Sequence, residues 1–173
     1  MKNVNIIGKW NQDKINKIND SCGNIIATRD CMKHINNIYF SYNKQKELIN
    51  KLYLDETDIP YKKELIRELD KKINSYKIQD INKNKYNNDN ITRDETIEKL
   101  VASKLKCYYC KKNVTIFYNI VRDMEQWTLD RIDNSINHSN NNVIISCLKC
   151  NLQRRCQDQN KFLFTKQLKI LKL

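Results

Sequence analysis

The chain has 173 residues, of which 40% are hydrophobic and 30% charged, a composition typical of a folded protein with apolar residues to spare for a core. It has no run of 18 apolar residues, which excludes a membrane span, and no signal-peptide stretch, so we expect an intracellular protein with no membrane partner. The net charge of +12 attracts phosphate polyanions, although a merely lysine-rich composition explains it equally well.

The first hundred residues predict mainly helices. Ranges 43–54 and 61–78 suit helices, and in the second range Leu65 and Leu69 recur at helical spacing after Pro60, which is placed for a first helical turn. We therefore interpret residues 1–80 as a helical N-terminal region of unknown role. Residues 81–91 follow as an Asn-rich linker, because they are rich in asparagine and contain no long apolar run.

A third helix is predicted directly after the linker. Residues 92–95 read Thr-Arg-Asp-Glu, the pattern of a capping box, and Ile97, Leu100 and Leu105 then mark an amphipathic helix that runs toward a pair of cysteines. Residues 92–173 are interpreted as a second domain with a helix at its C-terminal end. The positive charge is denser here, since 13 basic and five acidic residues between Val101 and Leu173 give +8.

Seven cysteines in an intracellular chain argue against disulfides and for metal binding. Four of them form two C-x-x-C pairs separated by 36 residues: Cys107, Cys110, Cys147 and Cys150. Four thiolates match the tetrahedral geometry of Zn²⁺ and leave no open coordination position, so the pattern predicts a structural zinc ion. Cys156 is left over, and Cys22, Cys31 and His34 fit no common zinc spacing, so we interpret them as incidental.

The segment between the cysteine pairs predicts two strands before a helix. Range 114–121 has alternating apolar residues and is a possible strand, and 127–131 alternates Trp127 and Leu129 with polar positions. A polar loop at 134–142 contains His138, residues 143–145 form a short apolar strand, and a helix is expected from Asn151. The fold class predicted is α+β, with a ββα unit stapled by zinc.

The chain contains, in this order, C-Y-Y-C, W-T-L-D-R-I-D-N, H and N-N-V-I-I-S-C-L-K-C-N-L-Q-R-R. This order of motifs resembles the HNH endonuclease family, in particular the zinc-knuckled proteins of large DNA viruses and phages. The resemblance covers about residues 104–155. It implies that Asp130 and Asn151 are ligands of a catalytic Mg²⁺ or Mn²⁺, and that Asn142 orients the general base. The place of that base, usually a histidine, is occupied by Arg131.

Because arginine cannot serve as the base, another residue has to accept the proton from water. His138 is the leading candidate, with Asp133 as a weaker one, while a histidine that only folds the loop is an equally good interpretation of His138. Arg131 would then grip a phosphate. Further nucleic-acid contacts are expected from Lys149, Arg154 and Arg155, with a solvated helix face as the alternative for the arginines.

The function predicted is a metal-dependent endonuclease acting on nucleic acid, with DNA the expected polymer. A binding protein that has lost its base is the first alternative, and a zinc-stapled structural protein in a larger assembly is the second. Tyr108, Tyr109 and Trp127 are aromatic residues near the cysteines that either stack on bases or, as we favour, fill a small core.

Overall fold

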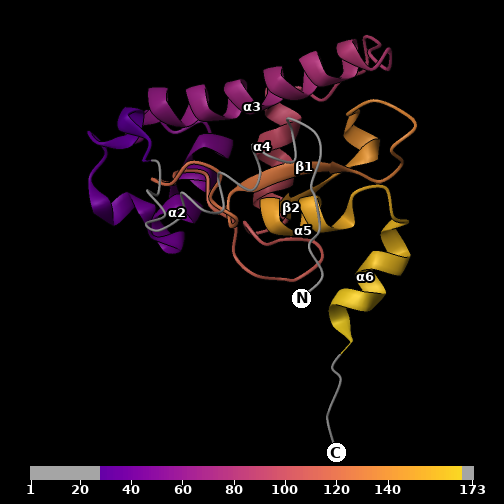
Figure 1. Ribbon diagram of the computed structural model, residues 1–173. Helices are drawn as coiled ribbons and strands as arrows, with labels where there is room; N and C mark the ends of the chain where they lie inside the picture. Colours follow the sequence, from indigo (N-terminus) through magenta and orange to yellow (C-terminus); the bar gives the residue numbers. More distant parts are fainter. Residues whose placement is uncertain (1–27, 169–173) are drawn as a thin grey trace, which may run out of the picture.

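The computed structural model describes residues 28–168 as a mixed α/β fold with five α-helices and one two-stranded antiparallel sheet in that range (Figure 1). A long helix lies across one side of the sheet, and a short helix packs against both strands. The α-helices and strands are α2 (Tyr42–Tyr53), α3 (Lys62–Asn82), α4 (Arg93–Ala102), β1 (Trp127–Arg131), β2 (Val143–Cys147), α5 (Leu148–Arg154) and α6 (Gln159–Gln167). None of these helices is long and apolar enough to cross a membrane.

Helices α2 and α3 confirm the two N-terminal helices that the sequence predicts. The apolar stripe of α3 is buried at Leu65 and Leu69, as the helical spacing requires. Pro60 lies two residues before the helix rather than in its first turn, and the chain enters α3 through Tyr61 in a left-handed conformation with φ of 55°.

The expected linker, residues 81–91, begins inside the last turn of α3 and then lies against the loop that connects the two strands. The Ile91 N–H donates to the carbonyl of His138 at 2.8 Å, and Lys85 donates to the carbonyl of Asn134. The side chain of Asn137 donates to Asn90 at 3.0 Å. The segment therefore fixes the position of the loop around His138.

The predicted capping box is present at the start of α4. The Thr92 hydroxyl accepts from the Glu95 N–H, and the Glu95 carboxylate accepts from the Thr92 N–H at 2.8 Å. The helix ends at Ala102, short of the cysteines, because Lys104 and Leu105 adopt positive φ angles that a helix cannot continue. Leu100 and Leu105 are buried and join α4 to the main core.

The sheet places the two faces of β1 in different surroundings. Trp127 lies opposite Cys147 and Arg131 opposite Val143, so the cysteines sit at one end of the sheet and the connecting loop at the other. Trp127 and Leu129 join the core beneath α3. The intervening residues of β1, Thr128 and Asp130, face α5, which contacts them through side chains.

The prediction of a strand at 114–121 is wrong, since this range, all of it described by the structure, forms isolated β-bridges and no continuous strand. Val114 and Ile116 are buried as the alternation suggests. At Ile116 and Phe117, however, the main-chain N–H groups donate to the buried side chain of Gln45, whose oxygen accepts them at 2.6 and 2.9 Å. A glutamine from α2 thus takes the place of a neighbouring strand.

Candidate metal centre and adjacent basic cavity

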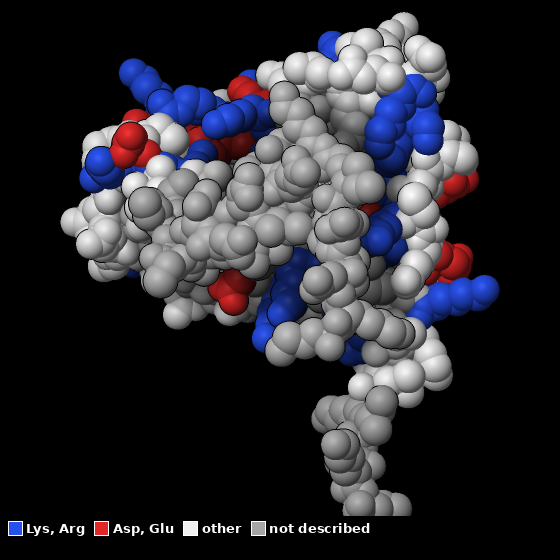
Figure 2. Space-filling view, viewed as in Figure 1, with Lys and Arg blue, Asp and Glu red and all other residues white. Residues whose placement is uncertain are grey.

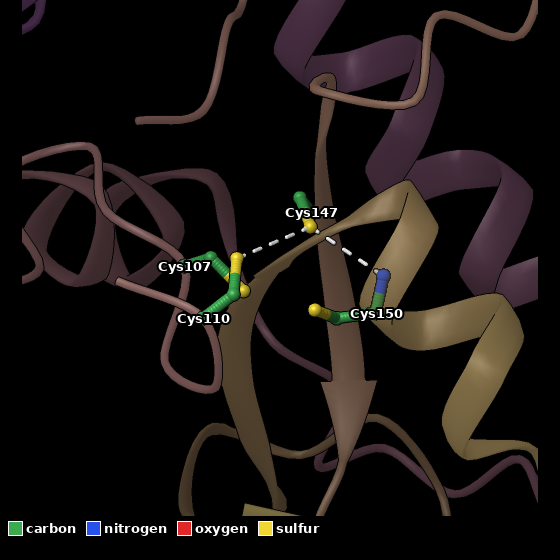
Figure 3. Close-up of side chains that lie close together, drawn as sticks. All are labelled: Cys107, Cys110, Cys147 and Cys150. Atoms are coloured by element: carbon green, nitrogen blue, oxygen red, sulfur yellow. Dashed lines mark hydrogen bonds between the residues drawn. The ribbon is translucent and has the colours of Figure 1, made fainter. Parts of the chain in front are cut away.

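The two C-x-x-C pairs come together at one end of the sheet (Figure 3). The first pair lies on a tight turn closed by the Lys111 N–H donating to the Cys107 carbonyl at 3.0 Å, with Lys111 in a left-handed conformation. In the second pair Cys147 ends β2 and caps α5, and Cys150 lies in the first turn of that helix. The helix expected from Asn151 therefore begins three residues earlier, inside the second pair.

The sulfur atoms have the spacing that a tetrahedral metal ion requires. All four Sγ atoms lie within 4.8 Å of one another, and the Sγ atoms of Cys110 and Cys147 are 3.9 Å apart. With Zn–S bonds of about 2.3 Å, the edge of a ZnS₄ tetrahedron is about 3.8 Å. The four cysteines can therefore hold a metal ion such as zinc with little rearrangement.

The thiols of the cluster share protons, and a bound cation would compete with these protons. Hydrogen bonds from the thiols of Cys147 and Cys150 lower the pKa of Cys107. Because the thiols of Cys147 and Cys150 donate to the Cys107 thiolate, their protonated forms are favoured. The pKa of Cys150 is therefore raised, and the pKa of Cys147 rises to about 12. A divalent ion bound to four thiolates replaces these shared protons, so binding releases protons and strengthens as the pH rises.

The other cysteines do not form a second cluster within residues 28–168. Cys31 and Cys156 are exposed, whereas Cys22 lies outside the described residues. The ring of His34 contacts the carboxylate of Glu64 at 3.2 Å instead of a thiol.

A cavity of about 320 Å³ lies along the outer edge of β1, between α3 and the end of α5; we refer to it as the β1-edge cavity. Four of the five residues that the resemblance or the loop pattern predicts as catalytic line it: Asp130, Arg131, His138 and Asn151. Its basic lining residues are Lys83, Lys85, Arg131 and Arg155. In Figure 2 Lys and Arg side chains gather near the C-terminal end of α3. A cavity with this lining attracts phosphate groups.

His138 is held by a carboxylate from α3. Its Nδ1 lies 2.8 and 2.9 Å from the two oxygens of Asp80, which also accepts from the His138 main-chain N–H at 2.9 Å. Burial disfavours the charge on Asp80, but these bonds and one from Asn90 outweigh it and lower its pKa. Burial also lowers the pKa of His138, against the opposing effect of Asp80. His138 and Asp130 form no hydrogen bond with each other.

Asp130 is a buried carboxylate with both oxygens engaged. Tyr109 donates its hydroxyl to Oδ2 at 2.7 Å, and Arg154 donates Nη1 to Oδ1 at 2.9 Å. Only 5% of Asp130 is exposed, and burial raises its pKa although Tyr109 and Arg154 favour the ionised form. Arg154 is itself 1% exposed and also donates to the carbonyls of Arg131 and Ile132. The prediction that Arg154 contacts phosphate is therefore wrong, because its guanidinium is buried and donates hydrogen bonds to the end of β1 and to Ile132.

The remaining predicted residues divide between the cavity and its surroundings. Asn151 donates from Nδ2 to Thr128 at 3.2 Å. Arg131 is 7% exposed and donates Nη1 to the carbonyl of Ile136, with Asp80 at 3.6 Å. Asn142 shapes the loop, since its amide donates to the carbonyls of Asp133 and Asn137 at 2.9 and 2.8 Å.

The other residues predicted to act in catalysis or nucleic-acid binding differ in their exposure to solvent. Lys149 and Asp133 are exposed and do not line the β1-edge cavity, whereas Arg155 is exposed and does. Tyr109 and Trp127 are fully buried, as expected for core residues, but Tyr108 is only partly buried.

Sequence reasoning missed Asp80, Lys83 and Lys85 because they lie outside the segment between the cysteines. One signal was present: Asp80 is the only acidic residue in the last turns of α3, where it precedes two lysines. Asp80 follows Leu69 by 11 residues, about three helical turns, so it continues the buried face of α3, but a polar residue at that position does not reveal its partner.

Comparison of the chain with protein-family models, with curated proteins and with solved structures gives no match in any of the three. The site is therefore defined by its own geometry: a four-cysteine cluster that can hold a metal ion, and a basic cavity with a carboxylate–histidine pair at the opposite end of the same sheet.

Proposed function

We propose that this protein is a metal-dependent endonuclease that hydrolyses phosphodiester bonds in nucleic acid, with DNA as the expected polymer. The proposal includes an HNH-like ββα unit formed by β1, β2 and α5, with zinc as its structural ion. The observation that carries it is the β1-edge cavity, which gathers Asp130, His138 and Asn151 among four basic residues. These groups are a base, two oxygen ligands and phosphate-binding cations, which phosphodiester hydrolysis requires.

His138 is the general base in this proposal. The Asp80 carboxylate accepts a hydrogen bond from Nδ1–H, which leaves the lone pair of Nε2 to take a proton from a water molecule. Within residues 28–168 Nε2 makes no hydrogen bond, and His138 lines the cavity. The lowered pKa keeps the ring neutral and able to act as a base at neutral pH.

The oxygen ligands for Mg²⁺ or Mn²⁺ are Asp130 and Asn151. Each Asp130 oxygen makes one hydrogen bond and retains a further acceptor position, and the Asn151 oxygen has no partner within the described residues. Mg²⁺ keeps several waters, so two protein ligands are sufficient. When bound, the ion would neutralise charge that develops on the phosphate.

A nucleic-acid-binding protein without cleavage activity is the second candidate, and the Asp130–Arg154 pair favours it. The guanidinium already neutralises the carboxylate that a cation would need, and Arg131 stands where the family has its histidine. Such a protein would bind nucleic acid with strong salt dependence and leave it intact. In that case Arg131→His is expected to create cleavage or to tighten divalent-metal binding.

The test is relaxation of supercoiled plasmid DNA with Mg²⁺ or Mn²⁺, and with EDTA as the metal-free control. His138→Gln is expected to lower the rate by about 10²- to 10⁴-fold, as removal of a general base does. His34→Gln is the matched control, because His34 is the only other histidine and lies at an exposed site away from the cavity.

Three results decide between the interpretations. Equal cleavage by the two histidine variants would show that His138 is not the base. Tight, salt-dependent binding of DNA by an intact protein that never cleaves would support the binding protein. Failure to bind nucleic acid even at low salt would reject both and favour a structural protein.

A further inference from the structure

We propose that a second cavity, at the outer edge of β2, binds an unpaired base of the nucleic-acid strand by stacking on Tyr108. We refer to it as the β2-edge cavity. This inference rests on the proposed function and deepens it, because it assigns a single-stranded or locally opened strand as the ligand. The β1-edge cavity and the β2-edge cavity lie at opposite edges of the two-stranded sheet.

The β2-edge cavity has the size and apolar surface that a flat ring requires. Its volume is about 340 Å³, at the lower end of the range for small-molecule sites of about 300–1,000 Å³. Val143, Ile144 and Ile145 form its wall along β2, and Ala102 contributes from the end of α4. No acidic side chain lines it.

Tyr108 is held in place as a stacking platform. Its main-chain N–H donates to the Ile145 carbonyl at 2.9 Å, which anchors the residue to the edge of β2. Its ring packs edge-on against Tyr109 with centroids 5.4 Å apart, and the Lys111 ammonium lies 4.9 Å from its centroid. Because Tyr108 is only partly buried, part of it remains available to a ligand. A preorganised aromatic ring loses little freedom on binding a base.

Three lysines supply the charge that a phosphate backbone needs. Lys99, Lys106 and Lys111 line the cavity, and none of them is ion-paired within residues 28–168, where the ion pairs of lysine involve Lys33, Lys44, Lys51 and Lys62. Four thiolates on a divalent ion carry a net charge of about −2, which two lysines offset. Lys104, Lys112 and Lys149 also lie near the cysteines in the sequence, so positive charge remains for a ligand.

An apolar cavity with an aromatic ring and with lysines that have no carboxylate partner within residues 28–168 matches a base joined to phosphates better than an acidic peptide. The Ile145 carbonyl at the edge of β2 is already taken by Tyr108, which weakens strand-to-strand pairing with a peptide. An acidic peptide that competes with the oligonucleotide would nevertheless reveal that alternative.

The first experiment measures binding of a fluorescein-labelled single-stranded DNA of 20 nucleotides by anisotropy, in EDTA at low salt and without cleavage. The EDTA is kept below the level that removes zinc, as checked by elemental analysis. Tyr108→Leu is expected to weaken binding about tenfold, whereas Tyr108→Phe, which keeps the ring, is expected to bind as the wild type does. Tyr53→Leu is the control at an exposed tyrosine of α2.

The second experiment uses salt dependence to count phosphate contacts. Lys106→Ala with Lys111→Ala is expected to make the slope of log K against log salt shallower by about 1.4, since each contact with a single strand contributes about 0.7. Lys46→Ala with Lys63→Ala removes the same charge from α2 and α3 and is expected to leave the slope unchanged. Equal slopes for the two double variants would overturn the proposal.

Cross-linking locates the base directly in the unmodified protein. A single-stranded oligonucleotide carrying 5-iodouracil is irradiated with the wild-type protein, and mass spectrometry is expected to identify Tyr108 in the cross-linked peptide. Cross-links only at residues other than Tyr108 would reject the site. Displacement of the oligonucleotide by an acidic peptide and by no other competitor would also reject it. Failure of this site with plasmid cleavage intact would leave the nuclease proposal standing, whereas absence of both binding and cleavage would reject the two together.

Discussion

The buried pair of Asp130 and Arg154 gives the sharpest prediction for the fold. Arg154→Met keeps a long side chain in the space but removes every hydrogen bond of the guanidinium. It leaves the Asp130 carboxylate with only Tyr109 as a donor and the carbonyls of Arg131 and Ile132 without their partner. Each buried acceptor left unsatisfied costs about 1–3 kcal/mol, and breaking a buried ion pair from one side costs about 3–5 kcal/mol in total.

We therefore expect Arg154→Met to lower the free energy of unfolding by about 3–5 kcal/mol, measured by urea denaturation with zinc present. For a chain of this size that corresponds to a melting temperature lower by about 6–20 °C. Arg155→Met is the matched control, because the neighbouring arginine is exposed and its loss is expected to change stability by less than about 0.5 kcal/mol.

A double variant shows whether the loss of stability comes from the unpaired charge of Asp130. Asp130→Asn removes that charge, so the combination with Arg154→Met is expected to be more stable than the sum of the two single changes predicts. Additive effects would show that the two side chains are not coupled. An Arg154→Met protein that is as stable as the wild type but binds DNA weakly would refute our interpretation. It would instead support the prediction that Arg154 contacts phosphate.

Three further predictions concern the metal, the base and a partly buried lysine. Cys150→Ser is expected to bind no zinc and to melt cooperatively at a much lower temperature, while Cys156→Ser, at an exposed cysteine outside the cluster, is expected to bind about one zinc ion per chain by elemental analysis. Asp80→Asn removes the group that raises the pKa of His138 against burial, so the acidic limb of the pH–rate profile is expected to move to lower pH with a lower maximal rate; an unchanged profile would contradict the pairing. Burial lowers the pKa of Lys72 to about 7, so the unfolded chain holds a proton that the folded chain releases, and stability is expected to rise by about 1–3 kcal/mol between pH 7 and pH 9. Lys72→Met is expected to lack that rise in urea denaturation, and a parallel rise in the variant would assign it to other groups.

The sequence predicted those elements whose signals are local. The capping box at Thr92 and Glu95 depends on residues three apart, and the helical stripe of Leu65 and Leu69 depends on one turn, so both could be read from the chain alone. The cysteine cluster was also predictable, because the spacing within each pair determines a turn that presents two sulfur atoms.

The parts that could not be predicted depend on contacts between distant segments. Alternation at Val114 and Ile116 indicates burial but not the partner of the Ile116 main chain, which is Gln45 from a helix about 70 residues earlier. The position of Arg154 near the end of a short helix is compatible with solvent or with the interior, and Asp130 decides between them by offering a buried carboxylate. The Asp80–His138 contact spans 58 residues and has no local signature.

The cysteine cluster and the β1-edge cavity lie at opposite ends of the sheet, so their roles are separate. Cys147 pairs with Trp127 at one end of the sheet, whereas Arg131 pairs with Val143 at the other, and four steps along an antiparallel strand span about 14 Å. An ion held by four sulfurs at that distance cannot contact a phosphate beside His138. It can only fix the end of the hairpin where the cysteines lie, while Arg154 and Asp80 fix the other end. If the cluster holds zinc and the β1-edge cavity cleaves nucleic acid as proposed, exchange of zinc for another tetrahedral thiophilic ion is expected to alter stability without altering the cleavage rate.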